Sequence, residues 1–224
     1  MAAADDCDLV AADVACRRGG RLVFEGLAFA LPPGGALVLT GANGSGKSSL
    51  LRLLATLLAP AAGRVSWGGK PVAGDPAGYR AQLHYVGHLD AIKPALGVGE
   101  TLSFWAAMRS VARPATDAAL AAFGLAALAD FPCRWLSAGQ RRRLALARLV
   151  AAPAPLWLLD EPTASLDADG EARLTAAIAA HRAAGGRVAV ATHQSMALPG
   201  ATRLALEDFA PAASDAAGDP LANF

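Results

Sequence analysis

The chain has 224 residues, of which 54% are hydrophobic and 17% are charged. A disordered chain is poor in apolar residues and rich in charge, so this composition indicates a folded protein of one domain, or of one domain with an inserted lobe. Twenty Lys and Arg residues stand against nineteen Asp and Glu residues, for a net charge of +1. This balance indicates no polybasic surface, so we expect no nucleic-acid partner.

The cysteines and the apolar segments bear on the compartment in which the chain works. Cys7, Cys16 and Cys133 are scattered, with no CxxC or CxxCH pattern, which favours a reducing compartment. The acidic N-terminus lacks the basic region of a secretory signal. No uncharged apolar stretch is as long as the roughly 18 residues that a membrane-spanning helix needs. We therefore expect a soluble chain, or one held at a membrane by another component.

Residues 9–58 predict the first unit of an α/β fold. Short strands and turns are expected over 9–40, and the apolar run 36–40 is typical of a buried parallel strand. A glycine-rich loop over 41–46 follows. Leucines then recur at helical spacing through 50–58, before a proline and a glycine close the helix.

The rest of the chain predicts further strands and helices around a helical lobe. Residues 64–90 show short strands and turns, and residues 91–150 are expected to hold an alanine-rich helical subdomain inserted in the α/β core. The later elements are expected to be a helix over 138–152, a strand over 156–159, a helix over 169–184 and a strand over 188–191. Residues 209–224 are expected to form a loose tail.

A complete phosphate-loop pattern, GxxxxGK[ST], follows the first parallel strand. It comprises Gly41, Ala42, Asn43, Gly44, Ser45, Gly46, Lys47 and Ser48, and we include Ser49 in the expected nucleotide-binding set. Glycines let backbone N–H groups point at phosphate oxygens, and the following helix adds its positive dipole end. Lys47 can reach the β- and γ-phosphates, and the Ser48 hydroxyl can ligate Mg²⁺. The flanking strand and helix favour this interpretation over a chance glycine-rich turn.

The apolar strand over 156–159 ends in two carboxylates, Asp160 and Glu161. Asp160 can hold Mg²⁺ through water, and Glu161 can polarise an attacking water molecule. The alternative is a solvated strand end, which the apolar residues before the pair and Pro162 after it make less favourable. A phosphate loop with such a pair indicates nucleotide hydrolysis, but it does not define what the energy drives.

A second device for binding phosphate lies at residues 136–140, Leu-Ser-Ala-Gly-Gln. Ser137 can cap the helix that follows, with Gln140 in the reciprocal position of a capping box, and the same helix N-terminus can bind phosphate. One γ-phosphate cannot easily use two such devices in one subunit. The economical interpretation is that Ser137 serves a nucleotide bound to another copy. Most of the arginines at 141–143 are expected to form a solvated face.

With these motifs the chain resembles the ATPase subunits of ATP-binding-cassette (ABC) transporters. The resemblance rests on the phosphate loop and on Leu-Ser-Ala-Gly-Gln at 136–140, which stands in place of the family's LSGGQ signature. It rests also on three shorter motifs: Leu-Leu-Asp-Glu-Pro at 158–162, Ala-Ser-Leu-Asp at 164–167 and Thr192-His193. It implies a P-loop NTPase (RecA-like) α/β core with an N-terminal antiparallel β subdomain and the inserted helical subdomain. All of these parts belong to one ABC ATPase domain over 9–208.

The resemblance also implies a homodimer that holds two ATP molecules, with Mg²⁺, at its interface. Lys47 and Ser48 of one subunit would bind an ATP. The opposite subunit would close over the γ-phosphate through its signature residues Ser137, Gly139 and Gln140.

The remaining family roles concern hydrolysis itself. Glu161 would act as the general base, and His193, directly after a buried strand, would sense and orient the γ-phosphate. Asp167 would link the two sites of the dimer. Lys47, Glu161 and His193 are therefore the expected catalytic residues.

Two departures from the family pattern stand out. His88 occupies the position of a usual glutamine, and its neutral imidazole can make one hydrogen bond near Mg²⁺, so Ser48, Asp160 and His88 form the expected metal set. The aromatic residue that stacks on adenine is absent, and Cys-Arg-Arg at 16–18 fills that stretch. An arginine there could stack through its guanidinium plane.

The motif pattern most resembles the CcmA group of cytochrome c biogenesis ATPases, the ATP-binding subunits of a haem exporter. Gly87-His88, residues 97–105 and Ala-Thr-His-Gln at 191–194 carry this likeness, whereas Leu89 replaces a glutamine often found there. The likeness implies a peripheral subunit on the cytoplasmic side of the cell inner membrane. It also implies a CcmB-like integral membrane subunit and CcmC-like and CcmE-like haem-handling partners.

The same likeness places the groove for the membrane partner at residues 88–110, where Phe104 and Trp105 are either exposed anchors or, more simply, helix core. His84 and His88 stand four apart in a strand-like segment without CxxCH, so we expect no direct haem binding by this chain. Two other functions stay open. One is an exporter ATPase for another substrate, and the other is a soluble ABC ATPase acting on nucleic acid or ribosomes, which the small net charge disfavours.

Overall fold

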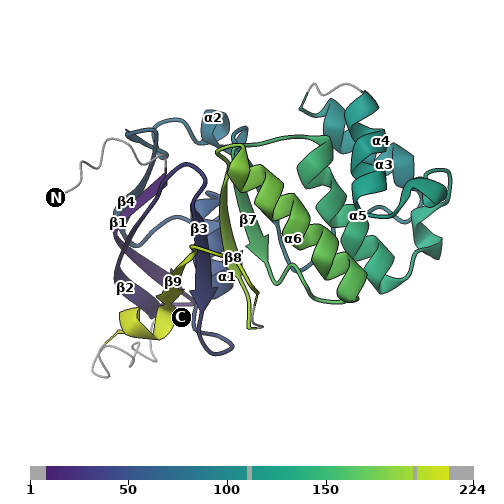
Figure 1. The fold of residues 1–224 in the computed structure, drawn as a ribbon. Helices are drawn as coiled ribbons and strands as arrows, with labels where there is room; N and C mark the ends of the chain where they lie inside the picture. Colours follow the sequence, from purple (N-terminus) through teal and green to yellow (C-terminus); the bar gives the residue numbers. More distant parts are fainter. Residues whose placement is uncertain (1–8, 110–112, 194–195, 212–224) are drawn as a thin grey trace, which may run out of the picture.

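The computed structural model describes residues 9–109, 113–193 and 196–211. Figure 1 shows an antiparallel sheet at one end of the molecule, a parallel sheet in the middle and a helical lobe at the other end. This mixed α/β architecture confirms the fold class that the sequence predicts.

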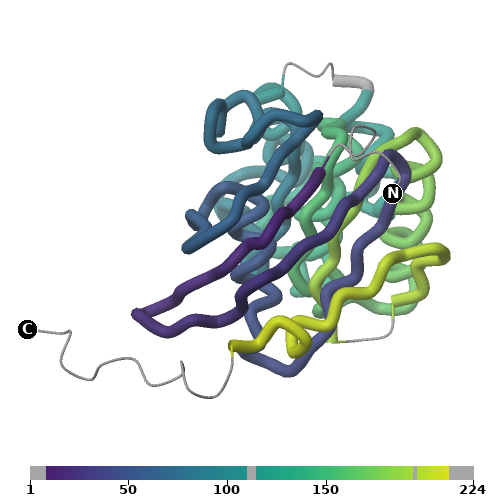
Figure 2. The backbone as a smooth tube through the Cα atoms, turned by 90° about the vertical axis from the view of Figure 1, so that its left-hand side faces the viewer, coloured from purple at the N-terminus to yellow at the C-terminus, as the bar shows by residue number. Residues whose placement is uncertain are grey.

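The antiparallel sheet has the strand order β2-β1-β4-β5. Its strands are β1 (Leu9–Arg18), β2 (Arg21–Leu31), β4 (Ala62–Trp67) and β5 (Lys70–Pro71). The β1–β2 hairpin turns at Gly19 and Gly20, whose φ angles of 53° and 78° cost glycine little. Figure 2 shows this long hairpin crossing the front of the molecule.

The five-stranded sheet is parallel and has the order β6-β7-β8-β3-β9. Its strands are β3 (Ala36–Thr40), β6 (Leu83–Val86), β7 (Leu156–Asp160), β8 (Arg187–Ala191) and β9 (Thr202–Ala205). Alternate residues enter two different cores: Leu37 and Leu39 of β3 pack on one face, and Ala36 and Val38 on the other. Burial of both faces explains why β3, β7 and β8 read as mainly apolar runs.

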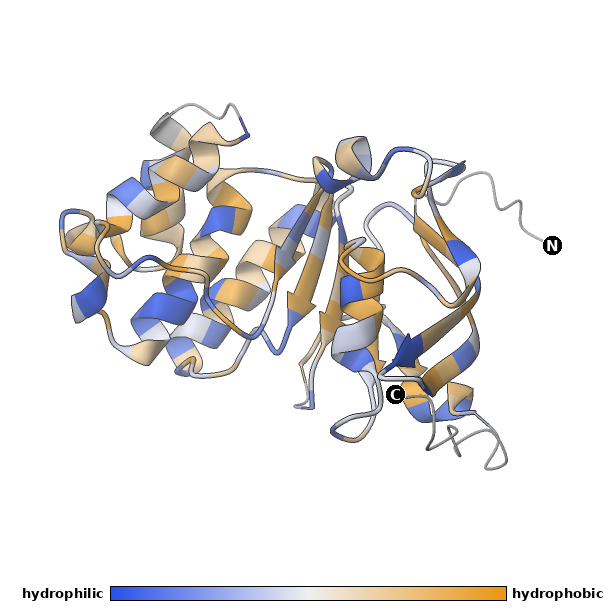
Figure 3. Cartoon of the chain, turned by 180° about the vertical axis from the view of Figure 1, so that it is seen from behind, coloured by the Kyte–Doolittle hydropathy of each residue, from blue (hydrophilic) through white to orange (hydrophobic). Residues whose placement is uncertain are grey.

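Helices cover both faces of the parallel sheet. Helix α1 (Lys47–Leu54) shares its core with the antiparallel sheet. The opposite core receives side chains from α3 (Val98–Ala107), α4 (Arg113–Ala122), α5 (Ala138–Ala151) and α6 (Ala168–Ala183). The shorter helices are α2 (Pro76–Arg80), η2 (Ala126–Leu128), η3 (Cys133–Trp135) and η4 (Leu206–Phe209). In Figure 3 the strands of the parallel sheet are mainly hydrophobic, whereas the helices carry hydrophilic patches.

The structure differs from the sequence expectations at the end of one helix and in two elements that were not predicted. The leucine pattern extends the first helix to residue 58, but α1 ends at Leu54, Thr56 turns into the left-handed region with φ of 56°, and Leu57 is 60% exposed. Neither α2 nor β9 was expected. The predicted tail lies largely outside the described residues, and the domain bounds of 9–208 and 91–150 stay predictions.

His84 is a buried strand residue and provides a prediction for stability. Its Nε2 donates to the Ala152 carbonyl, and burial lowers its pKa from 6.5 to about 3. As the pH falls below 6.5 the unfolded chain binds a proton at this site before the folded chain does, so stability falls until the pH reaches about 3. We expect His84 to remove about 2 kcal/mol of unfolding free energy between pH 6.5 and pH 5.

Urea unfolding of wild type and His84→Gln at both pH values measures this contribution. The glutamine retains an N–H donor and does not titrate, so its variant should lose less stability on acidification. His88→Gln, which replaces an exposed histidine, is the matched control. Equal acid sensitivity of wild type and His84→Gln would contradict the assignment.

Candidate active site

The phosphate loop lies between β3 and α1, at the carboxyl edge of the parallel sheet. Gly41 and Gly46 have φ angles of 138° and 106°, and a Cβ on Gly46 would come within 2.7 Å of Val23, so this position requires glycine. Lys47 is buried, and its Nζ donates to the carbonyls of Gly41 at 2.6 Å and Ala42 at 3.0 Å. The ammonium group is thus fixed inside the loop that would receive phosphate.

Two further groups in the loop bear on which atoms can meet a nucleotide. Ser45 has a buried hydroxyl with no hydrogen-bond partner among the described residues, as fits a group that would meet a phosphate oxygen. Ala42, by contrast, donates its N–H to Glu207 Oε1 at 2.8 Å. The Gly41–Ala42 peptide is therefore held by Lys47 at its carbonyl and by Glu207 at its N–H.

Ser48 and Asp160 meet across the first turn of α1 and the end of β7. The Ser48 hydroxyl donates to Asp160 Oδ1 at 3.0 Å. No cluster of three or more His, Cys, Asp or Glu side chains able to hold a metal occurs among the described residues. One hydroxyl and one carboxylate nevertheless fit Mg²⁺, which takes few protein ligands and completes its shell with phosphate and water oxygens.

Tyr85 of β6 is a neighbour of this pair that the sequence did not single out. Burial raises the pKa of its phenol, and the charge of Asp160 and a hydrogen bond with it add to this effect, against the opposing influence of Arg52. The phenol therefore stays protonated at neutral pH and can donate to Asp160. Its position at the end of a strand beside β7 comes from sheet order, which no local motif reveals.

Glu161 and His193 form a pair directly after β7 and β8. His193 Nδ1 lies 2.9 Å from Glu161 Oε2, and both side chains remain partly exposed to solvent. The Glu161 backbone has a φ of 47°, in the left-handed region that few non-glycine residues adopt. Two of the three predicted catalytic side chains are therefore in contact, and Glu161 directly follows Asp160 of the Ser48–Asp160 pair.

Arg142 corrects the expectation of a solvated arginine face at 141–143. Its side chain is only 3% exposed, and that of Arg143 is 16% exposed and pairs with Asp169. The Arg142 guanidinium contacts the backbone around Glu161. The basic run itself gives no signal of this burial, because the acceptors come from other segments of the chain.

The 136–140 segment has the local structure that its sequence predicts. Ser137 is the N-cap of α5, its Oγ accepts from Gln140 N at 3.2 Å, and Gln140 Oε1 accepts from Ser137 N at 2.9 Å. A Cβ on Gly139 would lie 2.8 Å from the Ser165 carbonyl, so close packing requires glycine there. The capping box is confirmed, and the role of Ser137 toward a second copy stays a prediction.

Other expected site residues are less engaged. Asp167 caps α6 by accepting from Gly170 N at 2.8 Å. His88 is exposed and makes no hydrogen bond to Ser48 or Asp160. In the stretch expected near adenine, Cys16 is fully buried, so only the two exposed arginines that follow it present side chains to solvent.

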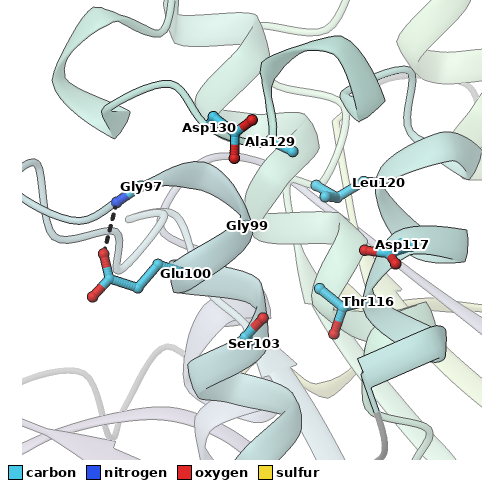
Figure 4. A pocket seen from close by; sticks show the side chains of 9 residues that line it. All are labelled: Gly97, Gly99, Glu100, Ser103, Thr116, Asp117, Leu120, Ala129 and Asp130. Carbon is cyan, nitrogen blue, oxygen red and sulfur yellow. Dashed lines mark hydrogen bonds between the residues drawn. The ribbon is translucent and has the colours of Figure 1, made fainter.

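A separate cavity of about 390 Å³ lies between α3 and α4 in the helical lobe (Figure 4). Its lining includes the carboxylates of Glu100, Asp117 and Asp130. Glu100 already accepts from the Gly97 N–H at 3.1 Å as part of a capping box. None of the predicted nucleotide-binding, metal-binding or catalytic residues lines this cavity, so it is distinct from the candidate active site.

Comparison with known proteins shows the family to which the chain belongs. The family model described as ABC transporter matches residues 24–164. A cytochrome c biogenesis ATP-binding export protein CcmA from Rhodospirillum rubrum is 61% identical over 92% of this chain and 88% of its own length. The protein of the same name from Paramagnetospirillum magneticum is 55% identical over 92% and 97%.

A solved structure supports the fold alone. A putative ABC transporter ATP-binding protein from Pyrococcus furiosus matches with a TM-score of 0.81 and 20% identity, over 91% of this chain and 100% of that one. The family model covers more than half of the chain, and the CcmA proteins match nearly all of it. The chain therefore belongs to the ABC transporter family, as an ATP-binding member.

Proposed function

We propose that this protein hydrolyses ATP to drive a membrane complex for c-type cytochrome biogenesis, in which haem is exported or released to its chaperone. The observation that carries the ATPase part is the meeting of the phosphate loop, the Ser48–Asp160 pair and the Glu161–His193 pair at one sheet edge. The cytochrome part is supported by the similarity to CcmA proteins. An exporter of another substrate remains the alternative.

The residues have distinct tasks in this proposal. Lys47 and the loop N–H groups bind the β- and γ-phosphates. Ser48 and Asp160 would hold Mg²⁺, which would supply neutralisation of the charge that develops on the phosphates. Glu161 takes the proton of the attacking water. His193 holds the Glu161 carboxylate through Nδ1, which would leave its other nitrogen available to the γ-phosphate.

The second half of each site is proposed to come from another copy of the chain. Ser137 caps its own helix as an acceptor, so its O–H proton is free to be donated to a γ-phosphate. The N-terminus of α5 adds the positive end of its dipole. A homodimer with two shared sites satisfies both phosphate-binding devices, with Asp167 near the junction.

A membrane partner is proposed to dock beside β6 and α3. None of the helices in the described ranges combines the length and hydrophobicity of a membrane span. A groove of about 750 Å³ lies there, with Trp105, Met108 and Arg148 among its lining residues. Within the predicted docking segment 88–110, Leu89 is 83%, Met108 71% and Phe104 52% exposed. Trp105 is partly buried, and the guanidinium carbon of Arg148 lies 5.1 Å from the centre of its ring. We assign this region to a CcmB-like subunit at the cytoplasmic side of the inner membrane, with CcmC-like and CcmE-like proteins completing the complex.

Co-purification from membranes tests the proposed partner. Co-expressed with the CcmB-like subunit, the wild-type chain should be recovered in the membrane fraction. The double variant Leu89→Asp, Phe104→Asp should reduce that recovery about 10-fold, because each substitution buries a charge at the contact. Ala176→Asp, which adds the same charge on an exposed position of α6, is the control. A wild-type chain found only in the soluble fraction would contradict the proposal.

A further inference from the structure

Arg142 is a buried cation that has no role in the reaction proposed above. It lies five residues after Ser137 in α5 and is 3% exposed. An arginine is rarely buried without partners, because desolvating its charge costs free energy that hydrogen bonds must offset. The partners of this guanidinium therefore indicate what its burial achieves.

The Arg142 guanidinium joins two segments that are distant in sequence. Nη2 donates to the carbonyls of Asp160 at 2.9 Å and Glu161 at 2.7 Å, and Nε donates to the carbonyl of Pro162 at 3.2 Å. On its other side, Nη1 donates to the carbonyl of Gly87 at 2.9 Å and to Asp90 Oδ1 at 3.1 Å. All three nitrogens of the planar fork are used, which a lysine ammonium cannot reproduce.

Glu161 depends on these contacts for its orientation. Its left-handed backbone, with φ of 47°, persists only if the surroundings hold it. Both backbone polar groups are held: the N–H donates to the Ala191 carbonyl at 2.9 Å, and the carbonyl accepts from Arg142 Nη2 at 2.7 Å and from the Ala164 N–H at 3.2 Å. This backbone turn sets the orientation of the Glu161 side chain. It therefore also sets the contact of the carboxylate with His193.

We infer that Arg142 is a positioning residue for ATP hydrolysis: it fixes the turn 160–162 that aims the Glu161 carboxylate, and it ties that turn to residues 87–90. Arg142 acts through Glu161 and does not itself touch the nucleotide in this inference. Lys47 and Ser48 lie on another element, and Asp160, which bonds Ser48, is also held by the pairing of β7 with β8. Nucleotide binding should therefore depend on Arg142 much less than hydrolysis does. The inference rests on the proposed hydrolytic role of Glu161.

Arg142→Lys tests this inference on the purified full-length chain. We expect kcat for ATP to fall about 10- to 100-fold, because a misplaced base loses most of its effect, while KM changes by less than about three-fold. In a Glu161→Gln background the same substitution should lower the remaining activity by less than about two-fold, since the group it positions is gone. Arg143→Lys, a neighbour with a surface ion pair, is the matched control.

Asp90→Asn is a second variant. It removes the charge of the partly exposed Asp90 side chain, and it leaves the hydrogen bonds from Arg142 to the backbone carbonyls in place. We expect its kcat to fall about three-fold at unchanged KM, because the contact between Arg142 Nη1 and residue 90 loses its ionic character. Wild-type kcat in Asp90→Asn would overturn the contribution of the Arg142–Asp90 ion pair to this tie. If Arg142→Lys lowered kcat by the same factor in the wild-type and Glu161→Gln backgrounds, the positioning role would be overturned. An inactive wild-type chain would instead count against the proposed hydrolysis itself.

Discussion

Glu161→Gln is expected to remove nearly all ATP hydrolysis while leaving ATP binding intact. The amide has the shape of the carboxylate and can still accept from His193, but it cannot take a proton from water. We expect kcat to fall about 1000-fold, near the upper part of the range for losing a general base. ATP affinity should be unchanged or higher, because a negative charge next to the phosphates is removed.

The same variant should accumulate as an ATP-loaded dimer, because the step that ends the closed state is blocked. Size-exclusion chromatography with Mg-ATP, together with a phosphate-release assay, measures both effects. Glu171→Gln, which changes an exposed carboxylate on α6, controls for loss of charge alone. Hydrolysis by Glu161→Gln within about two-fold of wild type would remove Glu161 as the base.

Lys47→Met is expected to lose nucleotide affinity. Methionine retains the unbranched length of the side chain but lacks the charge and the three donors of the ammonium, which here faces the Gly41 and Ala42 carbonyls. Hydrogen bonds between a cation and phosphate are among the stronger ones, so we expect the Kd for ATP to rise about 100-fold. Titration with a fluorescent ATP analogue measures this change.

Lys70→Met in β5 is the matched control, since it removes an exposed lysine remote from the loop. Its affinity should equal that of wild type. A Lys47→Met chain that binds ATP as tightly as the control would mean that the loop N–H groups alone hold the phosphates.

The parts of the site that the sequence predicts are those encoded in short contiguous segments. Gly41, Gly46 and Lys47 act within one loop, and their spacing alone indicates a phosphate cradle. Ser137 and Gln140 form their capping box within one helical turn, so its geometry follows from sequence separation. Strand β7 is an apolar run with its acid at the end, which places Asp160 at the carboxyl edge of a parallel sheet.

The contacts that the sequence could not provide join segments far apart in the chain. Glu207 reaches the Ala42 N–H only because β9 pairs beside β3, and nothing in the local sequence around it marks that role. Arg142 sits in a basic run typical of a solvated face, and its burial depends on where β6 and β7 end. The end of α1 at Leu54 likewise follows from the left-handed turn at Thr56, which leucine periodicity does not encode.

Mixing two inactive variants tests most directly whether each active site is shared between two copies. Lys47→Met disables the phosphate loop, and Ser137→Arg disables the signature by placing a bulky cation where the γ-phosphate should lie. In a shared site, a mixed dimer has one site with both defects and one site with none.

Equal amounts of Lys47→Met and Ser137→Arg should therefore regain ATPase activity that neither has alone. Random pairing makes half of the dimers mixed, each with one intact site of two, so about one quarter of wild-type turnover is expected. If Ser137 instead acted on the nucleotide of its own subunit, every chain in the mixture would carry one defect in its only site. Activity of the mixture no higher than that of the separate variants would contradict the shared site.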